Sequence, residues 1–147
     1  MAQYQNFEIN DDIARQIANT APDVRRLKDM LSVLADPEWA KTANLDLPVY
    51  YMHRAITQKD DLRYDITIIP PLMLGQEYNK TLGHYHLGTA ELYIILQGEA
   101  LFLAQERIAA KDDQIADCWF AKAVVGQSFA IPKTSAHFTI NAADCPL

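Results

Sequence analysis

Two histidines and a glutamate lie close together within residues 81–98. His84 and His86 are two positions apart, so on an extended strand both imidazoles leave the same face. Glu91 follows a four-residue connection and opens an apolar run, typical of a second strand, that closes at Gly98. Imidazole nitrogens and a carboxylate suit a divalent metal such as Fe, Mn, Ni, Zn or Cu. This stretch therefore predicts the first half of a metal site.

A second stretch, residues 126–141, supplies a further candidate ligand, His137, in its last strand. Together the three histidines and Glu91 offer three nitrogens and one oxygen, with room for water or substrate. Any one of these histidines alone is more simply explained as a hydrogen-bonded core residue, but three at this spacing favour a metal site. His53 belongs to no such pattern and is expected to be an ordinary strand residue whose role the sequence does not define.

The elements that must position these residues are short strands. From Pro48 onward apolar and polar residues alternate, and turn signals recur about every 8–12 residues, which is typical of an all-β sandwich or barrel. Gly98–Glu99 predicts a tight hairpin, residues 59–61 a turn, and residues 106–117 a solvated loop with a poorly defined strand. The predicted strands are 49–57, 62–69, about 81–86, 91–97, 100–105, 118–124, 127–131 and 136–141.

The N-terminal third has a helical pattern instead. Residues 11–18 predict a short amphipathic helix. Residues 21–35 predict a longer one, with Pro22 in its first turn and Pro37 ending it, and residues 38–43 add a further turn. The apolar stripe of the longer helix would be Val24, Leu27, Leu31 and Leu34. We expect a helical extension over residues 1–47, packed outside a barrel formed by residues 48–147.

Bulk composition excludes several classes of protein. The 147 residues carry a net charge of −6 with no run of Lys or Arg, which argues against a nucleic-acid or anionic-membrane surface. No signal peptide is apparent, and no apolar run approaches the ~20 residues that span a bilayer. Cys118 and Cys145 have no metal-site or disulfide spacing, so two reduced thiols in a cytoplasmic protein are expected.

Both stretches resemble the two sequence motifs of the cupin family, in order and about 27 residues apart. The matching positions of the first motif are His84, His86, Glu91 and Gly98. Those of the second are Gly126, Pro132, His137 and Asn141. Tyr78 and Thr134 stand where the family usually has glycine. The resemblance implies an all-β, jelly-roll-like cupin β-barrel with one or two N-terminal helices packed outside.

The resemblance extends beyond the two motifs. Over roughly residues 22–145 the sequence is similar to the archaeal-type, cupin glucose-6-phosphate isomerases. It is carried by V-R-R-L-K-D-M at 24–30, by residues 62–86 without a gap, and by A-E-L-Y at 90–93. The metal ligands that it implies are His84, His86, Glu91 and His137. The phosphate contacts that it implies are Thr67, Thr81 and Gly83. Tyr93 takes the place of the family's active-site tyrosine and would be catalytic together with Glu91.

The implied reaction is the glycolytic and gluconeogenic interconversion of glucose 6-phosphate and fructose 6-phosphate. One divalent metal per chain, with Fe preferred over Mn, Ni or Zn, would act as a Lewis acid. Glu91 would move the proton, or hydride would pass directly between C1 and C2. Lys80 and Lys133 flank the motifs and would be either a positive rim at the site's mouth or simply solvated. Without the resemblance, Thr67, Thr81 and Gly83 are more simply explained as strand threonines and a turn glycine, and Tyr93 equally well as a packed barrel aromatic.

Two alternatives stay open. One is another metal-dependent cupin enzyme, a dioxygenase or a sugar-modifying enzyme, and the other is a non-catalytic sugar-phosphate-binding cupin. The family continues past the second motif whereas this chain stops at Leu147, so we expect a shortened C-terminus whose effect on activity the sequence does not define. We also expect a homodimer, because a strand ending at Asn141 with no strand after it would leave a sheet edge open.

Overall fold

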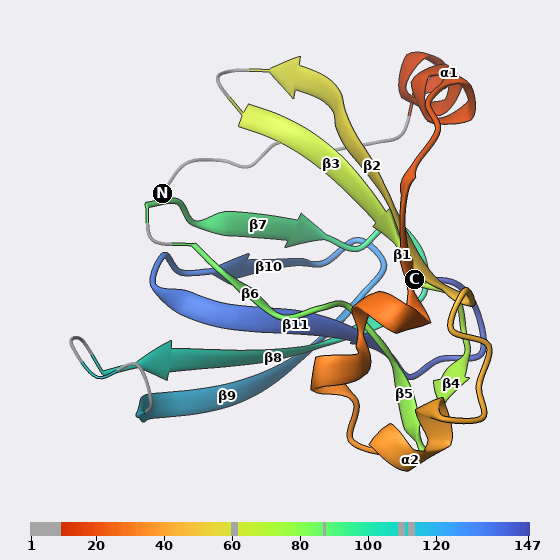
Figure 1. Ribbon diagram of the computed structural model, residues 1–147. Coiled ribbons are helices and arrows are strands. Elements are labelled where there is room, and N and C mark those ends of the chain that lie inside the picture. The colour runs from red at the N-terminus through yellow and green to blue at the C-terminus, as the bar shows by residue number, and fades with distance from the viewer. Residues whose placement is uncertain (1–9, 60–61, 87, 109–110, 112–113) are drawn as a thin grey trace.

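The computed structural model describes residues 10–59, 62–86, 88–108, 111 and 114–147, and Figure 1 shows their arrangement. The strands of these described residues form three separate sheets. The helical elements are α1 (Asp11–Asn19), the 3-10 turns η1 (Leu27–Asp29) and η2 (Leu31–Val33), and α2 (Pro37–Ala40). The first strands are β1 (Asp23–Arg26), β2 (Pro48–Lys59), β3 (Leu62–Ile68), β4 (Met73–Leu74), β5 (Glu77–Lys80) and β6 (His84–Tyr85). They are followed by β7 (Glu91–Ile94), β8 (Glu99–Arg107), β9 (Ile115–Val124), β10 (Ser128–Ile131) and β11 (Ser135–Asn141).

The largest sheet has the order β4-β5-β11-β8-β9, with β6 also paired to β11. Directly paired residues on antiparallel strands point to the same face. One face therefore carries the rows His137–Ala104–Trp119 and Thr139–Phe102–Ala121, and the other carries Phe138–Leu103–Phe120 and Ile140–Leu101–Lys122. Ala104 and Phe102 are fully buried whereas Phe120 is 58% exposed, so the first is the inner face and the second the outer face.

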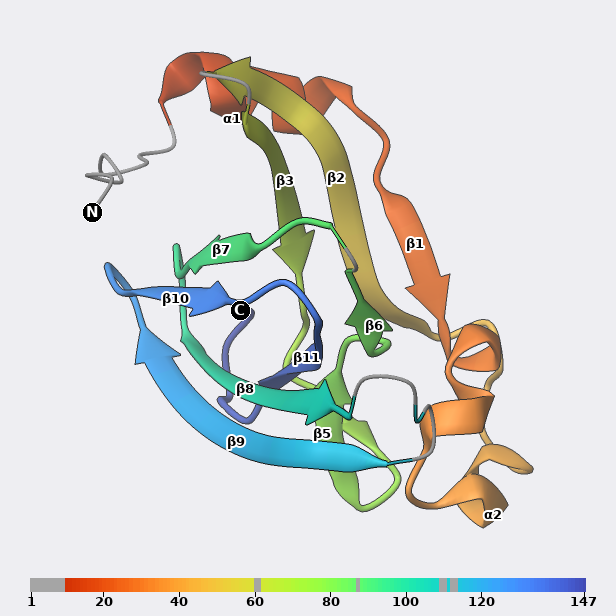
Figure 2. The same ribbon diagram turned by 90° about the vertical axis from the view of Figure 1, so that its left-hand side faces the viewer.

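The second sheet is β1-β2-β3, and it stands above the largest sheet in Figure 1. Tyr50 pairs with Arg25 of β1, and the registers Tyr51↔Ile68 and Met52↔Thr67 join β2 to β3. Helix α1 contacts β2 on the side away from the other sheets, where Ile13 is buried (Figure 2). The side chain of Asn10 caps this helix by accepting a hydrogen bond from the backbone N–H of Ile13 at 3.0 Å.

A two-stranded sheet of β7 and β10 lies between the other two, as both views show (Figures 1 and 2). Glu91 is paired with Ile131, and Tyr93 with Phe129. The apolar interior has two clusters. One is Leu27, Met30, Val49, Tyr50, Ile69 and Leu74, and the other is Ile95, Ala100, Phe102 and Ala123. Leu147 packs against both.

The prediction of an all-β fold with a short first helix is confirmed, although the ladders among the described residues form three sheets and not one closed barrel. His53 lies in β2, as expected for a strand residue, and Cys118 and Cys145 are free thiols. Of the turn predicted at residues 59–61, positions 60–61 lie outside the described residues. Across the described part of the chain, no helix is long and apolar enough to cross a membrane.

The predicted helix over residues 21–35 is wrong. The backbone at 23–26 is instead a strand paired with β2, and two 3-10 turns follow. Leu27 and Met30, three residues apart, are fully buried, whereas Leu31 of the expected stripe is exposed. An i, i+3 spacing suits the three-residue period of a 3-10 turn, and strand pairing with β2 overrides the local helical preference.

Three further strand predictions are corrected. Gly98–Glu99 does not close a hairpin, because β7 pairs with β10 while β8 pairs with β9 and β11. The predicted histidine strand shrinks to His84–Tyr85, and the β4–β5 hairpin precedes it, turning at Gly75 with φ +68°. The strand ending at Asn141 is no open edge either, since β11 has β5 and β6 on one side and β8 on the other.

Candidate metal centre

Two neighbouring strands bring the three predicted histidines together. In the β6–β11 ladder His84 is directly opposite His137, so both imidazoles point to the inner face. The His84 and His137 ring centroids are 4.3 Å apart, and the His84 and His86 centroids 4.8 Å. His137 is the buried member, with a side chain only 1% exposed, whereas His84 and His86 are partly open.

The β7 strand adds the carboxylate. Glu91 Oε2 lies 2.9 Å from His137 Nε2 and 3.4 Å from His84 Nε2, and its Oε1 lies 2.9 Å from His86 Nε2. All three imidazoles thus present the same ring nitrogen to one carboxylate group. The structure therefore brings together the four residues that the sequence proposed as ligands.

Tyr93, two residues along the same face of β7, completes the cluster. Its hydroxyl donates to Glu91 Oε2 at 3.0 Å and lies 2.8 Å from His137 Nε2. Beneath it the Tyr93 and Phe102 rings are 5.0 Å apart, and the Phe102 and Phe129 rings stack at 4.8 Å. These rings connect the polar cluster to the apolar core, of which Phe102 is a member.

Electrostatics of the cluster centre on the Glu91 carboxylate. Burial alone would raise the pKa of Glu91, but hydrogen bonds from His137, His84 and Tyr93 hold it well below its ordinary value. The same carboxylate raises the pKa of His84 through their hydrogen bond, against the opposing effect of burial. Burial, followed by the Glu91 charge, raises the pKa of Tyr93 far above 10, so its hydroxyl stays protonated.

The donor set fits a divalent metal. Ligand atoms of His84, His86 and Glu91 all lie within 4.8 Å of one another, and His137 Nε2 adds a fourth donor beside Glu91. His86 Nε2 is buried without a hydrogen-bond partner, since its 2.9 Å approach to Glu91 Oε1 lacks hydrogen-bond geometry. A ring nitrogen whose lone pair serves no hydrogen bond is available to coordinate. Three imidazole nitrogens and one carboxylate oxygen are a set typical of Fe, Mn, Ni or Zn.

Two of the three predicted phosphate residues, Thr81 and Gly83, lie next to the histidines in the chain, between β5 and β6. The backbone N–H of Thr81 donates to the carbonyl of Thr139 at 2.9 Å, and the Thr81 hydroxyl accepts from the backbone N–H of Thr139 at 3.0 Å. A methyl group on Gly83 would lie 3.7 Å from the carbonyl oxygen of His137. Residues 81–83 are therefore attached to β11 next to the backbone of His137.

Thr67 comes from the other side, on β3. It is exposed and is paired with Met52 on the face of the β1-β2-β3 sheet that also carries Tyr50. The Tyr50 hydroxyl accepts from the backbone N–H of Leu82 at 3.3 Å, so this face is turned toward residues 81–83. The structure thus places Thr67 on a surface facing the segment that holds Thr81 and Gly83.

Lys80, a cation that the sequence placed beside the first motif, turns away from the site. The charge of Arg54, which the sequence did not indicate, acts on it. Lys80 Nζ binds Glu77 and donates to the backbone carbonyl of Val33 at 2.8 Å, on the outer side of the large sheet. Lys80 is therefore neither at the mouth of the site nor a solvated lysine, because its side chain is only 14% exposed. Arg54 of β2 is close enough for its positive charge to lower the pKa of His84, against the larger effect of Glu91. No spacing rule connects positions 54 and 84, and only the tertiary arrangement reveals this proximity.

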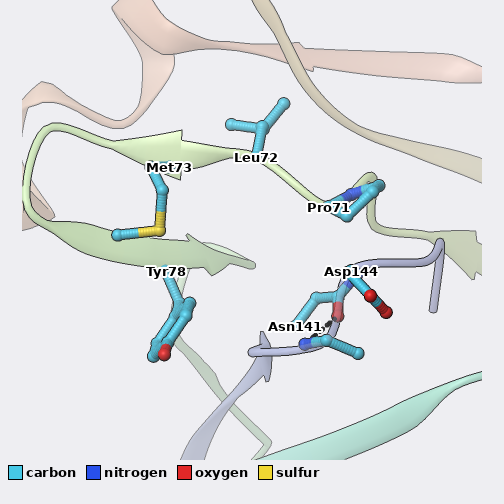
Figure 3. Close-up of a pocket in the computed structure, with 7 residues that line it drawn as sticks. Pro71, Leu72, Met73, Tyr78, Asn141 and Asp144 are labelled. Atoms are coloured by element: carbon cyan, nitrogen blue, oxygen red, sulfur yellow. Dashed lines mark hydrogen bonds between the residues drawn. The ribbon is translucent and has the colours of Figure 1, made fainter.

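Figure 3 shows a pocket of about 230 Å³ that does not coincide with the cluster. Met73 and Tyr78 line one side of it, and Asn141 and Asp144 the other. The Asn141 amide is already engaged, donating to the carbonyls of Ile69 at 2.7 Å and Cys145 at 2.9 Å. Because the Asn141 amide is taken up by the fold and none of the proposed ligands lines this hollow, we assign the chemistry to the histidine cluster.

The fold and the site together define an all-β protein of cupin type whose paired motifs gather a His-His-Glu group that could bind a metal. A family model described as "Glucose-6-phosphate isomerase (GPI)" matches residues 24–147. The chain therefore belongs to the glucose-6-phosphate isomerase family, in its cupin form, which is a family of isomerase enzymes.

Individual relatives agree with this assignment. The chain is 34% identical over 136 residues to a glucose-6-phosphate isomerase of Thermococcus litoralis, covering 88% of this chain and 68% of that protein. It is 30% identical to one of Pyrococcus furiosus, with the same coverage. Among solved structures it is similar to a cupin-2 domain containing protein from Shewanella frigidimarina, at 17% identity and a TM-score of 0.42 over 80% of this chain and 92% of that one. The assignment rests on the family model and the relatives.

Proposed function

We propose that this chain interconverts glucose 6-phosphate and fructose 6-phosphate at the centre formed by His84, His86, Glu91 and His137. The observation that carries the proposal is the convergence of three imidazole Nε2 atoms on one carboxylate, in a chain of this isomerase family. One divalent metal per chain, which we propose to be iron, would supply Lewis-acid polarisation of the substrate carbonyl.

Glu91 and Tyr93 are proposed to handle the proton that must move between oxygens. Conversion of the open-chain aldose to the ketose moves a hydrogen from C2 to C1 and a proton from the C2 oxygen to the C1 oxygen. The C2 hydrogen can move in two ways. Glu91 can shuttle it to C1 as a proton, or it can pass directly from C2 to C1 as hydride, with Glu91 relaying only the oxygen-bound proton and Tyr93 orienting that carboxylate.

Isotope labelling tests this division of roles. Fructose 6-phosphate formed in ²H₂O should carry no deuterium at C1 if the hydride moves directly. Full incorporation of deuterium would show that a base such as Glu91 removes the C2 hydrogen as a proton and exchanges it with solvent.

Thr67, Thr81 and Gly83 are proposed to hold the phosphate. Two hydroxyls and a backbone N–H can together cradle an anion. The Thr81 oxygen already accepts from Thr139 N–H, and its own proton can still be donated to a phosphate oxygen. Calorimetry should therefore show binding of fructose 6-phosphate but not of free fructose to the metal-loaded protein.

Thr81 variants separate its two roles. Thr81→Val should weaken fructose 6-phosphate binding, and it should also lower the free energy of unfolding by about 1–3 kcal/mol, because the backbone N–H of Thr139 loses its partner. Thr81→Ser keeps a hydroxyl and should retain both properties, and metal content should be unchanged in each variant.

The assay that tests the function itself is coupled isomerase turnover by metal-loaded protein, with chelated protein as the control. Turnover that appears only with metal supports the proposal. If phosphosugar binds without turnover, a sugar-phosphate-binding protein is the better description. Equal affinity for fructose and fructose 6-phosphate would overturn the assignment of substrate.

We also propose a cytoplasmic homodimer that pairs through the outer face of the large sheet. The row Phe138–Leu103–Phe120 crosses β11, β8 and β9 on that face, with Phe120 58% exposed. Contiguous apolar residues on a sheet face favour burial against another surface. This row replaces the open strand edge as the structural reason to expect a dimer.

A further inference from the structure

None of the three residues proposed to hold the phosphate carries a positive charge. Thr67, Thr81 and Gly83 supply hydroxyls and a backbone N–H, whereas a sugar phosphate carries nearly two negative charges near pH 7. Anion recognition of this kind commonly includes a guanidinium, which binds phosphate in a bidentate manner. Lys80 does not serve, because it is bound to Glu77 and to the backbone of Val33.

Arg54 lies on the sheet face that is turned toward this site. Along β2 the side chains of Tyr50 and Met52 share one face with Thr67, which is paired with Met52. Arg54 Nη1 lies 3.9 Å from Asp65 Oδ2, and Asp65 is two residues from Thr67 on β3, so Arg54 is on this face as well. Tyr50 of the same face reaches the backbone of Leu82, between Thr81 and Gly83.

The guanidinium is held in position, yet one of its ends has only a weak partner. Arg54 Nε donates to Asp23 Oδ2 at 2.8 Å, which orients the planar group. Nη2 contacts the thioether sulfur of Met52 at 3.3 Å, a poor acceptor compared with a phosphate oxygen. The side chain is 48% exposed, so a ligand can approach it.

We propose that Arg54 is a specificity-determining residue that binds the substrate's phosphate from the β1-β2-β3 sheet, opposite the histidine cluster. The inference rests on the proposed function and extends it, since it assigns the charge that selects phosphorylated over neutral sugars. Asp23 and Asp65 hold the guanidinium, and Nη2 exchanges the sulfur of Met52 for a phosphate oxygen when substrate arrives.

The test is calorimetry on the metal-loaded protein with two probes, a phosphorylated five-carbon sugar acid and the same sugar acid without its phosphate. Arg54→Gln should weaken binding of the phosphorylated acid by about 10- to 100-fold, the range for loss of a charged hydrogen bond, and leave the unphosphorylated acid and the metal content unchanged. Arg54→Lys keeps the charge and should recover part of the lost affinity. In turnover, KM for fructose 6-phosphate should rise in Arg54→Gln with a smaller change in kcat.

Arg63→Gln is the matched control. Arg63 binds the same Asp65 carboxylate at 2.6 Å but stands four residues before Thr67, toward the start of β3. It should leave both affinities unchanged. If Arg54→Gln weakens both probes equally, or if Arg54→Gln and Arg63→Gln behave alike, Arg54 only stabilises the sheet and the inference is wrong.

The proposed function has a separate outcome. A wild-type protein that binds the phosphorylated acid no better than the unphosphorylated one would remove the substrate assignment, and the role of Arg54 with it. A wild-type preference that survives Arg54→Gln and Arg54→Lys unchanged would remove the role of Arg54 alone.

Discussion

Tyr93 is the residue through which the cluster is tied to the apolar core. Its hydroxyl contacts both Glu91 and His137, while its ring packs on Phe102. Tyr93→Phe keeps the ring and removes a hydrogen bond to a charged group, worth roughly 1.5–3 kcal/mol. We expect kcat to fall by about 10-fold or more with metal content retained, as measured by coupled assay and elemental analysis.

Tyr85→Phe is the control for that experiment. Tyr85 is paired with Ala136 on the outer face, and the Arg107 guanidinium lies 4.7 Å from its ring centroid, an interaction that phenylalanine preserves. It should leave kcat unchanged. A Tyr93→Phe enzyme as active as Tyr85→Phe would show that the hydroxyl takes no part in orienting Glu91.

The His84–Glu91 pair predicts a pH window for the metal-free protein. The folded pKa of Glu91 is lowered, so its contribution to stability is present above about 4.5 and is lost as the pH falls through the lowered folded value. The folded pKa of His84 is raised, so its contribution is present below 6.5 and is lost as the pH rises through the raised value. Chelated protein should therefore be most thermally stable, as far as this pair is concerned, between about pH 4.5 and 6.5.

Thermal unfolding of chelated wild type and of chelated His84→Gln across this range measures the effect. The variant should lose the decline in stability above pH 6.5. Bound metal should suppress the same decline in the wild type, because a metal replaces the proton on the imidazole. Identical pH profiles for the two chelated proteins would show that the pair does not contribute.

At the scale of elements, alternation and short motifs were enough to predict most strands and the four side chains that lie together in the cluster. Strand periodicity is a local property, and H-x-H fixes two imidazoles on one face whatever lies around them. The helix predicted over residues 21–35 was wrong because pairing of residues 23–26 with β2 is a non-local contact. The buried positions Leu27 and Met30, three apart, suit the 3-10 turns that follow that strand. The sequence did not indicate Arg54 because its effect on His84 is also non-local and depends on how two sheets are arranged.

The connection between β7 and β8 depends on a glycine. Gly98 has φ +72°, and a methyl group there would come within 2.9 Å of the carbonyl oxygen of Pro146. Gly98→Ala should lower the free energy of unfolding by about 1–3 kcal/mol, because the left-handed backbone is strained for alanine. Chemical denaturation gives the value directly.

Gly88→Ala provides the comparison, because apart from the adjoining residues of the chain no described heavy atom lies within 4 Å of a methyl group at that position. Its effect on unfolding should be small. Similar losses in the two variants would mean that neither the backbone conformation nor the Pro146 contact at Gly98 matters for stability.

At the scale of the whole molecule, the outer face of the large sheet predicts association. Light scattering should show a dimer, and Phe120→Lys should shift it toward monomer, because a buried ammonium group without a partner opposes pairing. Leu62→Lys adds the same charge at an exposed position on β3 and should leave the dimer intact. A wild-type protein that is monomeric at high concentration would contradict the proposed interface.

The two motif stretches together are proposed to hold one divalent metal. Elemental analysis of protein that has been chelated and then reloaded tests it most directly, comparing wild type with the double variant His84→Ala/His86→Ala. His53→Ala, which removes a histidine of β2 that no proposed ligand set includes, serves as the control. We predict about one metal per chain in the wild type and in the control, following the ligand logic of three imidazoles and a carboxylate, and loss of metal in the double variant together with the thermal stability that the metal confers. Unchanged metal content in the double variant would contradict the account.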